Sequence, residues 1–281
     1  MCGGLGRPGE DWTALRPITS QPALNDMRQS RDRTAWLEGG PAQCRVGPPL
    51  NTKARRLVLL GAPGIGKGTQ ADLLGQRFGT CQLSTGDVFR AAKANSGCDC
   101  SPALATALEL MRRGELVSDG TVLEIIKERI KCLRCHGGFL LDGFPRTVPQ
   151  AEALEGMLAA EQIALDAAVS YELPLDQIVA RLSGRRTCPR CQAIFHLETR
   201  PPRAVGLCDQ CGAALFQRED DRPESIRVRM ETYERNTAPL AAFYRERELL
   251  ISISAEGTPE EILNRTVAAL EARRSEDRVG F

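Results

Sequence analysis

The sequence has no long apolar run and no surplus of charge of either sign. No stretch approaches the roughly eighteen apolar residues of a membrane-spanning helix, and the N-terminus lacks the apolar segment of a signal peptide. Lysine plus arginine (37) nearly balance aspartate plus glutamate (36), so no overall field attracts nucleic acid or an anionic membrane. We therefore expect a soluble cytoplasmic protein without nucleic-acid or membrane partners, in which any anion site is a local cluster.

The sequence does have enough apolar residues to bury a core, and it is rich in cysteine. With 42% hydrophobic residues in 281, the chain can form one sizeable domain or two modest ones. Eleven cysteines, several in close pairs, would suggest disulfides in a secreted chain. In a cytosolic protein they indicate metal sites or free thiols.

Residues 1–52 form a region of their own, rich in glycine and proline and without a sustained apolar period. We expect an unstructured N-terminal extension that is dispensable for chemistry. The only tryptophans of the protein, Trp12 and Trp36, lie in this region, so a docking element is one alternative. A start codon assigned too far upstream is another, and an organelle-targeting segment is less favoured because acidic residues interrupt the basic ones.

The chain is organised around the segment from Leu57 to Phe78. An apolar run, Leu57 to Leu60, leads into a glycine-rich loop that ends at Lys67, and apolar residues then recur at helical spacing. This strand, loop and helix are typical of a polyphosphate site, because backbone N–H groups and the helix N-terminus bind anions and the lysine reaches the terminal phosphates. A merely structural glycine turn is the alternative. The loop departs from the strict Walker A pattern, since Gly68 follows the lysine and the hydroxyl comes at Thr69.

The rest of the chain alternates between strand and helix patterns, which predicts a parallel sheet with helices on both faces. Strands are expected at 82–84, 139–141, 167–173 and 249–254. Helices are expected at 85–93, 102–113, 118–134, from Pro149, after Pro174, at 223–248 and at 259–274.

Asp142 ends one of the apolar strands. A carboxylate there emerges at the sheet edge that faces the glycine-rich loop at 61–67, which is called the phosphate loop below. Such a carboxylate can hold magnesium, often through water. Capping of a helix or turn is the alternative role.

Between Gly184 and Asp221 the pattern changes to short extended pieces with paired cysteines, which predicts a small inserted domain. Two C-x2-C pairs separated by sixteen residues indicate a closed tetrahedral zinc site with a structural role, and redox thiols are the alternative. The four predicted ligands are Cys188, Cys191, Cys208 and Cys211.

A second set of four cysteines consists of one C-x-C pair and one C-x2-C pair. These residues are interpreted as free thiols, with a second metal site as the alternative: Cys98, Cys100, Cys132 and Cys135.

Five segments, in this order, resemble those of adenylate kinases: GAPGIGKGTQ, LSTGDVFR, GFLLDGFPRTVPQ, RLSGRR and REDDRPESIRVR. The resemblance covers Arg55 to Arg274. It implies a P-loop NTPase-like α/β fold, a doubly wound parallel sheet of about five strands, with an inserted AMP-binding helical segment at 85–117 and a small zinc-ribbon-like lid at 184–221. The kinase domain is expected to span 53–281. Zinc-bearing lids occur in a subset of this family, and FHLETRPP resembles the stretch that such lids place near ATP, so His196 is expected to pack or contact nucleotide rather than bind metal.

The resemblance also implies roles for individual residues. AMP contacts are implied for Thr85, Arg90, Leu116, Val117, Gly143, Arg146, Gln150, Arg218 and Arg229. ATP and Mg²⁺ contacts are implied for Gly64, Ile65, Gly66, Lys67, Gly68, Thr69, Asp142, Arg181, Phe195 and Gly257. The residues implied to act on the transferred phosphoryl group are Lys67, Arg146, Arg181, Arg185, Arg218 and Arg229. Asp220 and Asp221 match the paired aspartates at the end of the lid, whereas Gly120 stands where the family commonly has glutamate.

The implied reaction is reversible phosphoryl transfer from ATP-Mg to AMP, giving two ADP, by a monomeric enzyme. Such a transfer needs charge neutralisation and in-line positioning but no general base, which fits the arginines and the lack of a Ser-His-Asp arrangement. A kinase for UMP or CMP is the nearest alternative, and Thr85 with Gln150 argues against it. A zinc-ribbon interaction module that uses ATP as a switch is an alternative of another class.

Overall fold

The computed structural model describes residues 55–85, 110, 117–128, 138–191 and 193–279. The predictions for the N-terminal extension, for Arg90 and Leu116, for the second cysteine set, and for most of the helices at 85–93 and 102–113 lie outside this part of the chain.

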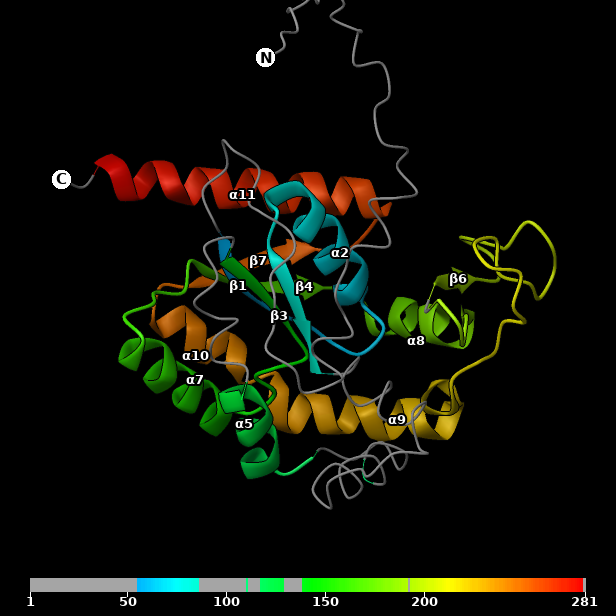
Figure 1. The fold of residues 1–281 in the computed structure, drawn as a ribbon, viewed down its shortest axis with the longest axis horizontal. Coiled ribbons are helices and arrows are strands. Elements are labelled where there is room, and N and C mark those ends of the chain that lie inside the picture. Colours follow the sequence, from blue (N-terminus) through cyan, green and yellow to red (C-terminus); the bar gives the residue numbers. More distant parts are fainter. Residues whose placement is uncertain (1–54, 86–109, 111–116, 129–137, 192, 280–281) are drawn as a thin grey trace, which may run out of the picture. The chain divides into compact units, whose positions relative to one another are not determined.

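A five-stranded parallel sheet forms the centre of the described chain, in the order β2-β3-β1-β4-β7 (Figure 1). Its strands are β1 (Arg55–Leu60), β2 (Cys81–Ser84), β3 (Gly138–Asp142), β4 (Ala167–Glu172) and β7 (Leu250–Ser254). Each predicted strand is present. Because all five run in one direction, their carboxyl ends meet at a single edge, where the phosphate loop follows β1.

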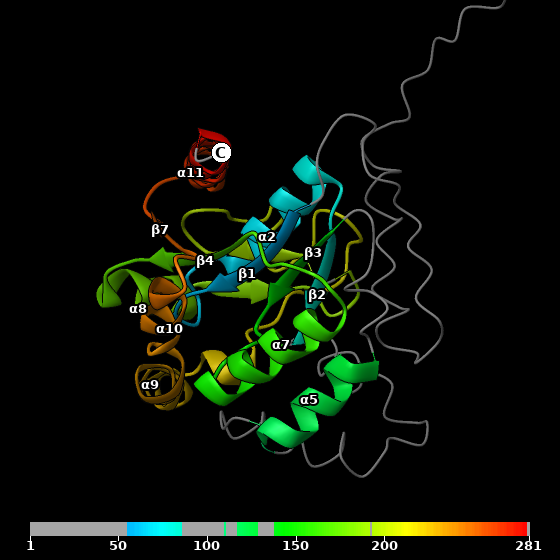
Figure 2. The same ribbon diagram turned by 90° about the vertical axis from the view of Figure 1, so that its left-hand side faces the viewer.

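Helices cover both faces of the sheet (Figure 2). On one face α2 (Lys67–Phe78) and α11 (Pro259–Val279) pack against side chains such as Leu57, Leu59 and Val169. On the other, α5 (Asp119–Glu128), α7 (Val148–Ala160) and α10 (Leu240–Glu246) enclose a second cluster. The doubly wound α/β fold expected from the alternating pattern is therefore confirmed.

Local signals set several helix ends. Gly79 ends α2 in a left-handed conformation, with φ of 67°, and its N–H bonds to the carbonyl of Gly75. Thr147 caps α7 by accepting a hydrogen bond from the N–H of Gln150. Helix α11 runs to Val279, beyond the expected end at Arg274.

The helix expected over 223–248 is interrupted. The structure has α9 (Pro223–Thr232), a π-helical turn η2 (Tyr233–Thr237), and then α10. In the π turn the N–H of Ala238 donates to the carbonyl of Tyr233, five residues earlier. Pro239 follows and has no N–H, so it cannot continue an i to i−4 ladder. This explains why one helical pattern becomes two α-helices with a wide turn between them.

Helix α8 (Leu175–Ser183) leads into the small inserted segment. Here β5 (Arg185–Thr187) and β6 (Ile194–His196) form an antiparallel pair, and the 3-10 turn η1 (Glu219–Asp221) leads into α9. No helix of the described residues is long and apolar enough to cross a membrane.

Candidate active site and zinc-binding lid

The phosphate loop links β1 to α2 and depends on glycine. Gly64 has φ of 82°, and a Cβ on it would lie 2.4 Å from Cγ of Leu182 in α8, so a side chain there is excluded. Gly66 is the left-handed residue before α2, and Ile65 is buried against the sheet. Gly68 and Thr69 lie in the first turn of α2, where helix N–H groups face outward. The predicted ATP residues of the loop thus lie together at the N-terminus of α2, an arrangement that suits an anion.

Lys67, the first residue of α2, folds back over this loop. Its Nζ donates to the carbonyls of Gly61 at 2.6 Å and Ala62 at 2.9 Å. Burial lowers the pKa of Lys67 from near 10.5 to about 8; Asp142 opposes this, and the charges of Arg146, Arg229 and Arg185 add to the lowering. Three predicted catalytic arginines and the predicted magnesium ligand therefore act electrostatically on this ammonium.

Asp142 is the last residue of β3, in register with Leu59 of β1 and Ser84 of β2. A Cβ placed on Gly68 would lie 3.5 Å from the Asp142 Oδ2 atom, so this carboxylate sits beside the first turn of α2. Carboxylate and hydroxyl oxygens suit Mg²⁺, which keeps several waters and binds through one or two carboxylates plus substrate phosphates. Asp142 fits such a site, and Thr69, which follows Gly68 in α2, offers a hydroxyl.

A second group of predicted residues gathers where β2 and β3 end. Thr85 Oγ1 and Arg146 Nε both donate to the carbonyl of Gly143, at 2.9 and 2.8 Å. Gly143 has φ of 80°, and a side chain there would approach Thr85 Oγ1 within 3.0 Å. Gln150 is 2% exposed, and its Oε1 accepts the N–H of Arg146 at 2.8 Å. Four residues predicted for AMP are thus brought together, and Val117 is buried in the core cluster on the same face of the sheet.

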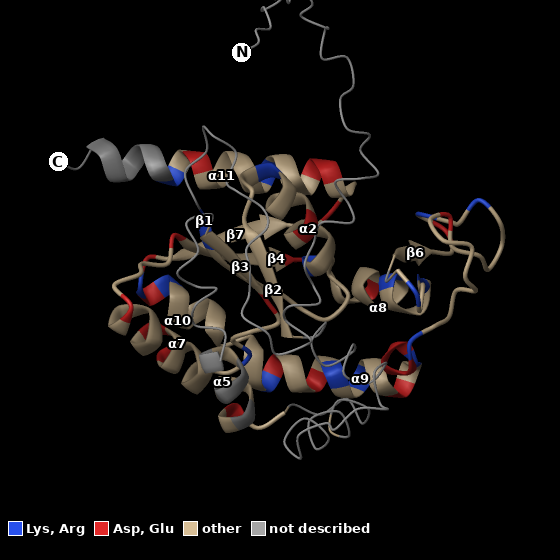
Figure 3. Cartoon of the chain, viewed as in Figure 1, with Lys and Arg blue, Asp and Glu red and all other residues tan. Residues whose placement is uncertain are grey.

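The arginines at the end of the lid are paired with the two aspartates. The side chain of Asp221 is fully buried and accepts from Arg185 Nε at 2.7 Å and from Arg229 Nη1 at 3.2 Å. Arg229 also lies 2.9 Å from Asp220. Burial lowers the pKa of Arg229, and Asp220 opposes this shift. Charged residues of both signs lie along α9 (Figure 3). The two aspartates therefore hold the guanidinium groups of Arg185 and Arg229 in fixed positions.

Arg181 and Arg218 contact other parts of the structure. Arg181, in α8, donates to the carbonyl of Ile65 in the phosphate loop at 3.2 Å and to that of Ala255 at 2.9 Å. It joins the loop to the segment between β7 and α11, which contains Gly257, with φ of 93°. Arg218 donates to Thr187 Oγ1 at 3.0 Å, inside the lid. The action of Arg181 and Arg218 on the transferred phosphoryl group stays a prediction.

The four lid cysteines form one cluster, with their sulfur atoms all within 4.8 Å of one another. Cys188 Sγ lies 3.4 Å from Cys211 Sγ, and Cys191 Sγ lies 3.4 Å from Cys208 Sγ. Zinc with four thiolates at about 2.3 Å needs sulfur separations of about 3.8 Å, so a small expansion accommodates the ion. Burial raises the pKa of the Cys188 thiol, but backbone hydrogen bonds outweigh this and lower it to about 7. The donor set fits a structural zinc ion.

Phe195 and His196 are two further lid residues for which the sequence predicted contacts with nucleotide or packing. Phe195 is 4% exposed and packs in the lid core with Cys188 and Cys208, so its predicted contact with ATP stays untested. His196 is outside the cysteine cluster, as predicted. Its Nδ1 accepts the N–H groups of Glu198 and Thr199, which leaves the proton on Nε2, 3.3 Å from the carbonyl of Ala180.

Comparison with known proteins identifies the family. The adenylate kinase family model matches residues 59–249. The chain belongs to the adenylate kinase family. It is 46% identical over 218 residues to the adenylate kinase of Thermodesulfovibrio yellowstonii, covering 78% of this chain and all of that protein. It is 50% identical over 206 residues to the adenylate kinase of Pelobacter propionicus, covering 73% of this chain and 92% of that protein. A third relative, the adenylate kinase of Trichlorobacter lovleyi, is 48% identical over 215 residues, with 76% and 98% covered.

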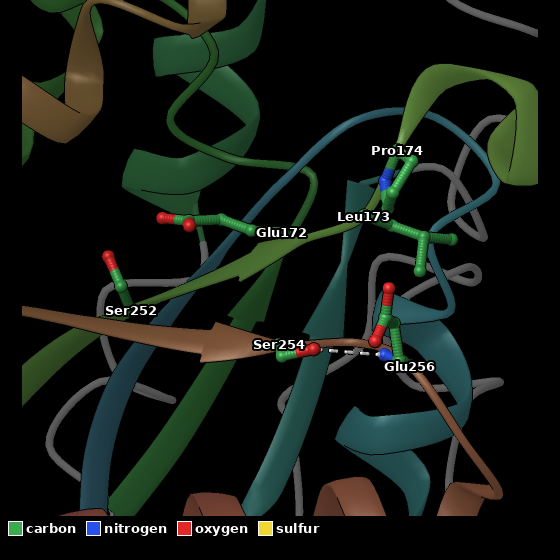
Figure 4. Close-up of a pocket in the computed structure, with 6 residues that line it drawn as sticks. All are labelled: Glu172, Leu173, Pro174, Ser252, Ser254 and Glu256. Atoms are coloured by element: carbon green, nitrogen blue, oxygen red, sulfur yellow. Dashed lines mark hydrogen bonds between the residues drawn. The ribbon is translucent and has the colours of Figure 1, made fainter.

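The described residues of this adenylate kinase family member also line a shallow hollow of about 380 Å³ at the carboxyl ends of β4 and β7 (Figure 4). Glu172 and Glu256 contribute carboxylates to it, and Ser252 and Ser254 contribute hydroxyls. An acidic lining repels phosphate, so the hollow is not the nucleotide phosphate site. The loop around Lys67 carries the complementary charge.

The sequence analysis did not identify two residues that contact Gln150 and Arg146, for which the family resemblance implies AMP binding. Asp119 accepts a hydrogen bond from Gln150, and Thr237 donates one to the carbonyl of Arg146 at 2.9 Å. These partners are separated from their targets by 31 and 91 residues, and no local pattern marks them. An aspartate at the start of α5 could be noted from sequence, but it reads as an ordinary helix-end charge.

Proposed function

We propose that this chain catalyses reversible transfer of the γ-phosphoryl group of ATP to AMP, giving two ADP. The observation that carries the proposal is that Arg146 belongs to two groups of residues. Lys67 of the phosphate loop interacts electrostatically with Arg146, Arg229 and Arg185. Arg146 also bonds to Gly143 and Gln150, and Thr85 donates to the same Gly143 carbonyl. The first group offers positive charge to a polyphosphate, and the second offers a guanidinium, a hydroxyl and an amide to a second nucleotide. Family membership supports the same reaction.

In this reaction an oxygen of the AMP phosphate attacks the γ-phosphorus of ATP. The bond between that phosphorus and the β,γ-bridging oxygen breaks, and the electron pair goes to the departing ADP. The attacking oxygen is already ionised, so no side chain has to remove a proton. Lys67, Arg146, Arg185 and Arg229 supply charge where negative charge moves, while the phosphate loop binds the donor. Arg181 and Arg218 are proposed to complete this set from α8 and from the lid.

The proposed cofactor of the reaction is Mg²⁺, bound with ATP. Asp142 and Thr69 would hold it, the carboxylate through water, and the ion would neutralise charge on the phosphates. On the acceptor side Thr85, Val117, Gly143 and Gln150 are proposed to bind AMP. Roles for Arg90 and Leu116 stay predictions because these residues lie outside the described part of the chain.

A structural zinc ion is proposed for the lid, held by the four clustered cysteines. Thiolate ligation requires reduced cysteines, which favours a reducing compartment such as the cytoplasm. The proposed domain division keeps the kinase at 53–281, with the AMP-binding segment at 85–117 and the lid at 184–221. The monomeric state stays a prediction.

A coupled assay of ADP formation tests the proposal, with ATP-Mg as donor and AMP, GMP, CMP and UMP as acceptors. We expect turnover with AMP to exceed turnover with each of the others by at least about a hundredfold, the scale of discrimination that a few hydrogen-bonded contacts provide. Preference for UMP or CMP would identify a different monophosphate kinase. ADP formation that does not depend on any acceptor would favour an ATP-hydrolysing switch.

A further inference from the structure

A carboxylate that none of the predicted sites contains joins α5 to the start of α7. Asp119 is the first residue of α5, and both of its oxygens accept hydrogen bonds from the other helix end. Gln150 Nε2 donates to Oδ1 at 2.6 Å, and Thr147 Oγ1 donates to Oδ2 at 3.0 Å. Thr147 in turn accepts the N–H of Gln150 as the cap of α7. One side chain thus holds the amide and the helix cap together.

This network fixes which way the Gln150 amide faces. Its Oε1 accepts the N–H of Arg146 at 2.8 Å, while its Nε2 donates to Asp119. Turning the amide over would place Oε1 against a carboxylate and Nε2 against an N–H, so both contacts would become repulsive. Because Gln150 is only 2% exposed, water offers little compensation for either loss. The amide therefore has one preferred orientation.

An amide offers two N–H donors and two acceptor positions. Among the described residues, Asp119 takes one donor and Arg146 occupies one acceptor, so one of each is left for a further partner. The pairing edge of adenine offers a ring nitrogen that accepts and an amino group that donates. Guanine offers a ring N–H and a carbonyl, which is the reversed pattern; uracil shares it. A fixed amide can match one pattern only.

We propose that Asp119 is a positioning residue that sets base selectivity in this enzyme by locking the orientation of the Gln150 amide. The inference rests on the proposed function, in which Gln150 binds AMP, and adds that the remaining donor and acceptor of its amide contact the base. It goes further by assigning the choice between adenine and the reversed pattern to a residue that does not touch the nucleotide. The same carboxylate supports the backbone of Arg146 through Gln150, so its loss also weakens AMP binding.

The test compares kcat/KM for AMP and GMP in the full-length wild type, Asp119→Ala and Asp119→Asn. Losing one charge-assisted hydrogen bond predicts a roughly tenfold higher KM for AMP in Asp119→Ala, a roughly tenfold smaller ratio of AMP to GMP efficiency, and an unchanged KM for ATP. Asp119→Asn keeps an oxygen for Gln150 and should hold the ratio within about threefold of wild type. If Asp119→Ala is insoluble, Asp119→Ser takes its place with the same expectation, because its hydroxyl is too short to reach Gln150.

Asp166 provides the matched control. It accepts the N–H of Arg56 at 2.6 Å, far along the chain from the AMP-side residues, so Asp166→Ala should lower stability without changing the ratio. An unchanged ratio in folded Asp119→Ala, or an equal loss in Asp119→Asn or Asp166→Ala, would overturn the inference. Failure of the wild type to form ADP from ATP and AMP would instead overturn the proposed function, so the two failures are distinguishable.

Discussion

At the scale of single residues, the ammonium of Lys67 has the most altered environment in the phosphate loop. Burial lowers its pKa to about 8, which means that the free protein holds this proton weakly. Bound phosphates add negative charge and raise the pKa again. Well below pH 8 the Lys67 ammonium is charged before ATP binds, so its titration adds no pH dependence to ATP affinity. Above pH 8 binding must take up a proton, and affinity falls as pH rises.

We therefore predict uptake of roughly 0.5 to 0.8 proton when ATP binds at pH 8.5, because a group with a pKa of about 8 is already partly protonated there. Calorimetric titration in two buffers with different ionisation enthalpies measures this number directly. The Lys67→Met variant should show no such uptake, since methionine has no proton to gain. Equal uptake in the variant, or ATP affinity that stays constant between pH 7 and 9.5, would contradict the assigned environment of Lys67.

The burial of Asp221 leads to a second prediction at this scale, which concerns the free energy of unfolding. It is fully buried between Arg185 and Arg229, whose side chains are 15% and 20% exposed. Asp221→Ala leaves two guanidinium groups without their counter-charge and should lower the free energy of unfolding by about 2–4 kcal/mol, somewhat less than for a wholly buried pair. Denaturant unfolding measures this loss.

The pair of Arg227 and Glu231 on α9 serves as the control. Its atoms lie 3.8 Å apart, and its side chains are 80% and 61% exposed, so Glu231→Ala should change stability by less than about 0.5 kcal/mol. Similar losses in Asp221→Ala and Glu231→Ala would show that the buried pairing is not a major stabilising contact.

At the scale of elements, the π turn η2 connects the arginine-bearing helix α9 to the loop of Arg146. The wide turn places Thr237 where its hydroxyl donates to the Arg146 carbonyl. Thr237→Val removes this bond without changing side-chain size, so we predict a several-fold loss of kcat/KM for AMP and about 1 kcal/mol less stability. Thr237→Ser should restore both values.

Thr266, in α11, is a fully buried control threonine, whereas Thr237 is partly buried. The Thr266 hydroxyl donates to the carbonyl of Ile262 and lies 3.3 Å from the hydroxyl of Tyr171. Thr266→Val should lower stability by a similar amount and leave the kinetics unchanged. If Thr237→Val changes stability alone, as Thr266→Val is expected to do, the π turn only supports the fold.

The lid is the element whose fold would depend most on the proposed zinc ion. Its apolar core consists of a few side chains around Cys188, Phe195 and Cys208, which is too little to stabilise a domain. Structural zinc contributes on the order of 10 kcal/mol of apparent binding free energy in comparable modules. Replacing Cys188 and Cys191 by serine should therefore remove about one zinc per chain and lower the melting temperature, as metal analysis and calorimetry would report.

Cys81 lies in β2, outside the lid, and gives the control: Cys81→Ser should keep the full zinc content. A wild-type protein purified without zinc under reducing conditions, or a double serine variant with unchanged zinc, would show that the cysteine cluster serves another purpose.

At the scale of the whole molecule, prediction from sequence succeeds where the signal is local. Three features were located to within a few residues from local patterns. They are the loop before Lys67, the end of β3 at Asp142 and the cysteine cluster of the lid, and the structure has all three. The interrupted helix before Pro239 was not predicted, because apolar spacing continues smoothly across a π turn.

Long-range pairings escaped prediction for a different reason. The strand order β2-β3-β1-β4-β7 depends on crossovers that no strand encodes alone. The pairing of Asp221 with Arg185 and Arg229, and that of Asp119 with Gln150, joins residues that become neighbours only after the sheet and helices pack. Family resemblance named both arginines and Asp221, but it did not give the contacts between them.

The central claim is that one site transfers a phosphoryl group between two nucleotides, and phosphorus NMR tests it most directly. With Mg²⁺, the protein should convert ATP and AMP to ADP and should convert ADP alone to ATP and AMP, reaching the same mixture from both sides without releasing inorganic phosphate. Lys67→Met should slow both directions by ~100-fold or more, since one such charge commonly contributes that much to transition-state stabilisation. Release of inorganic phosphate from ATP without AMP, or no reaction starting from ADP, would contradict the account.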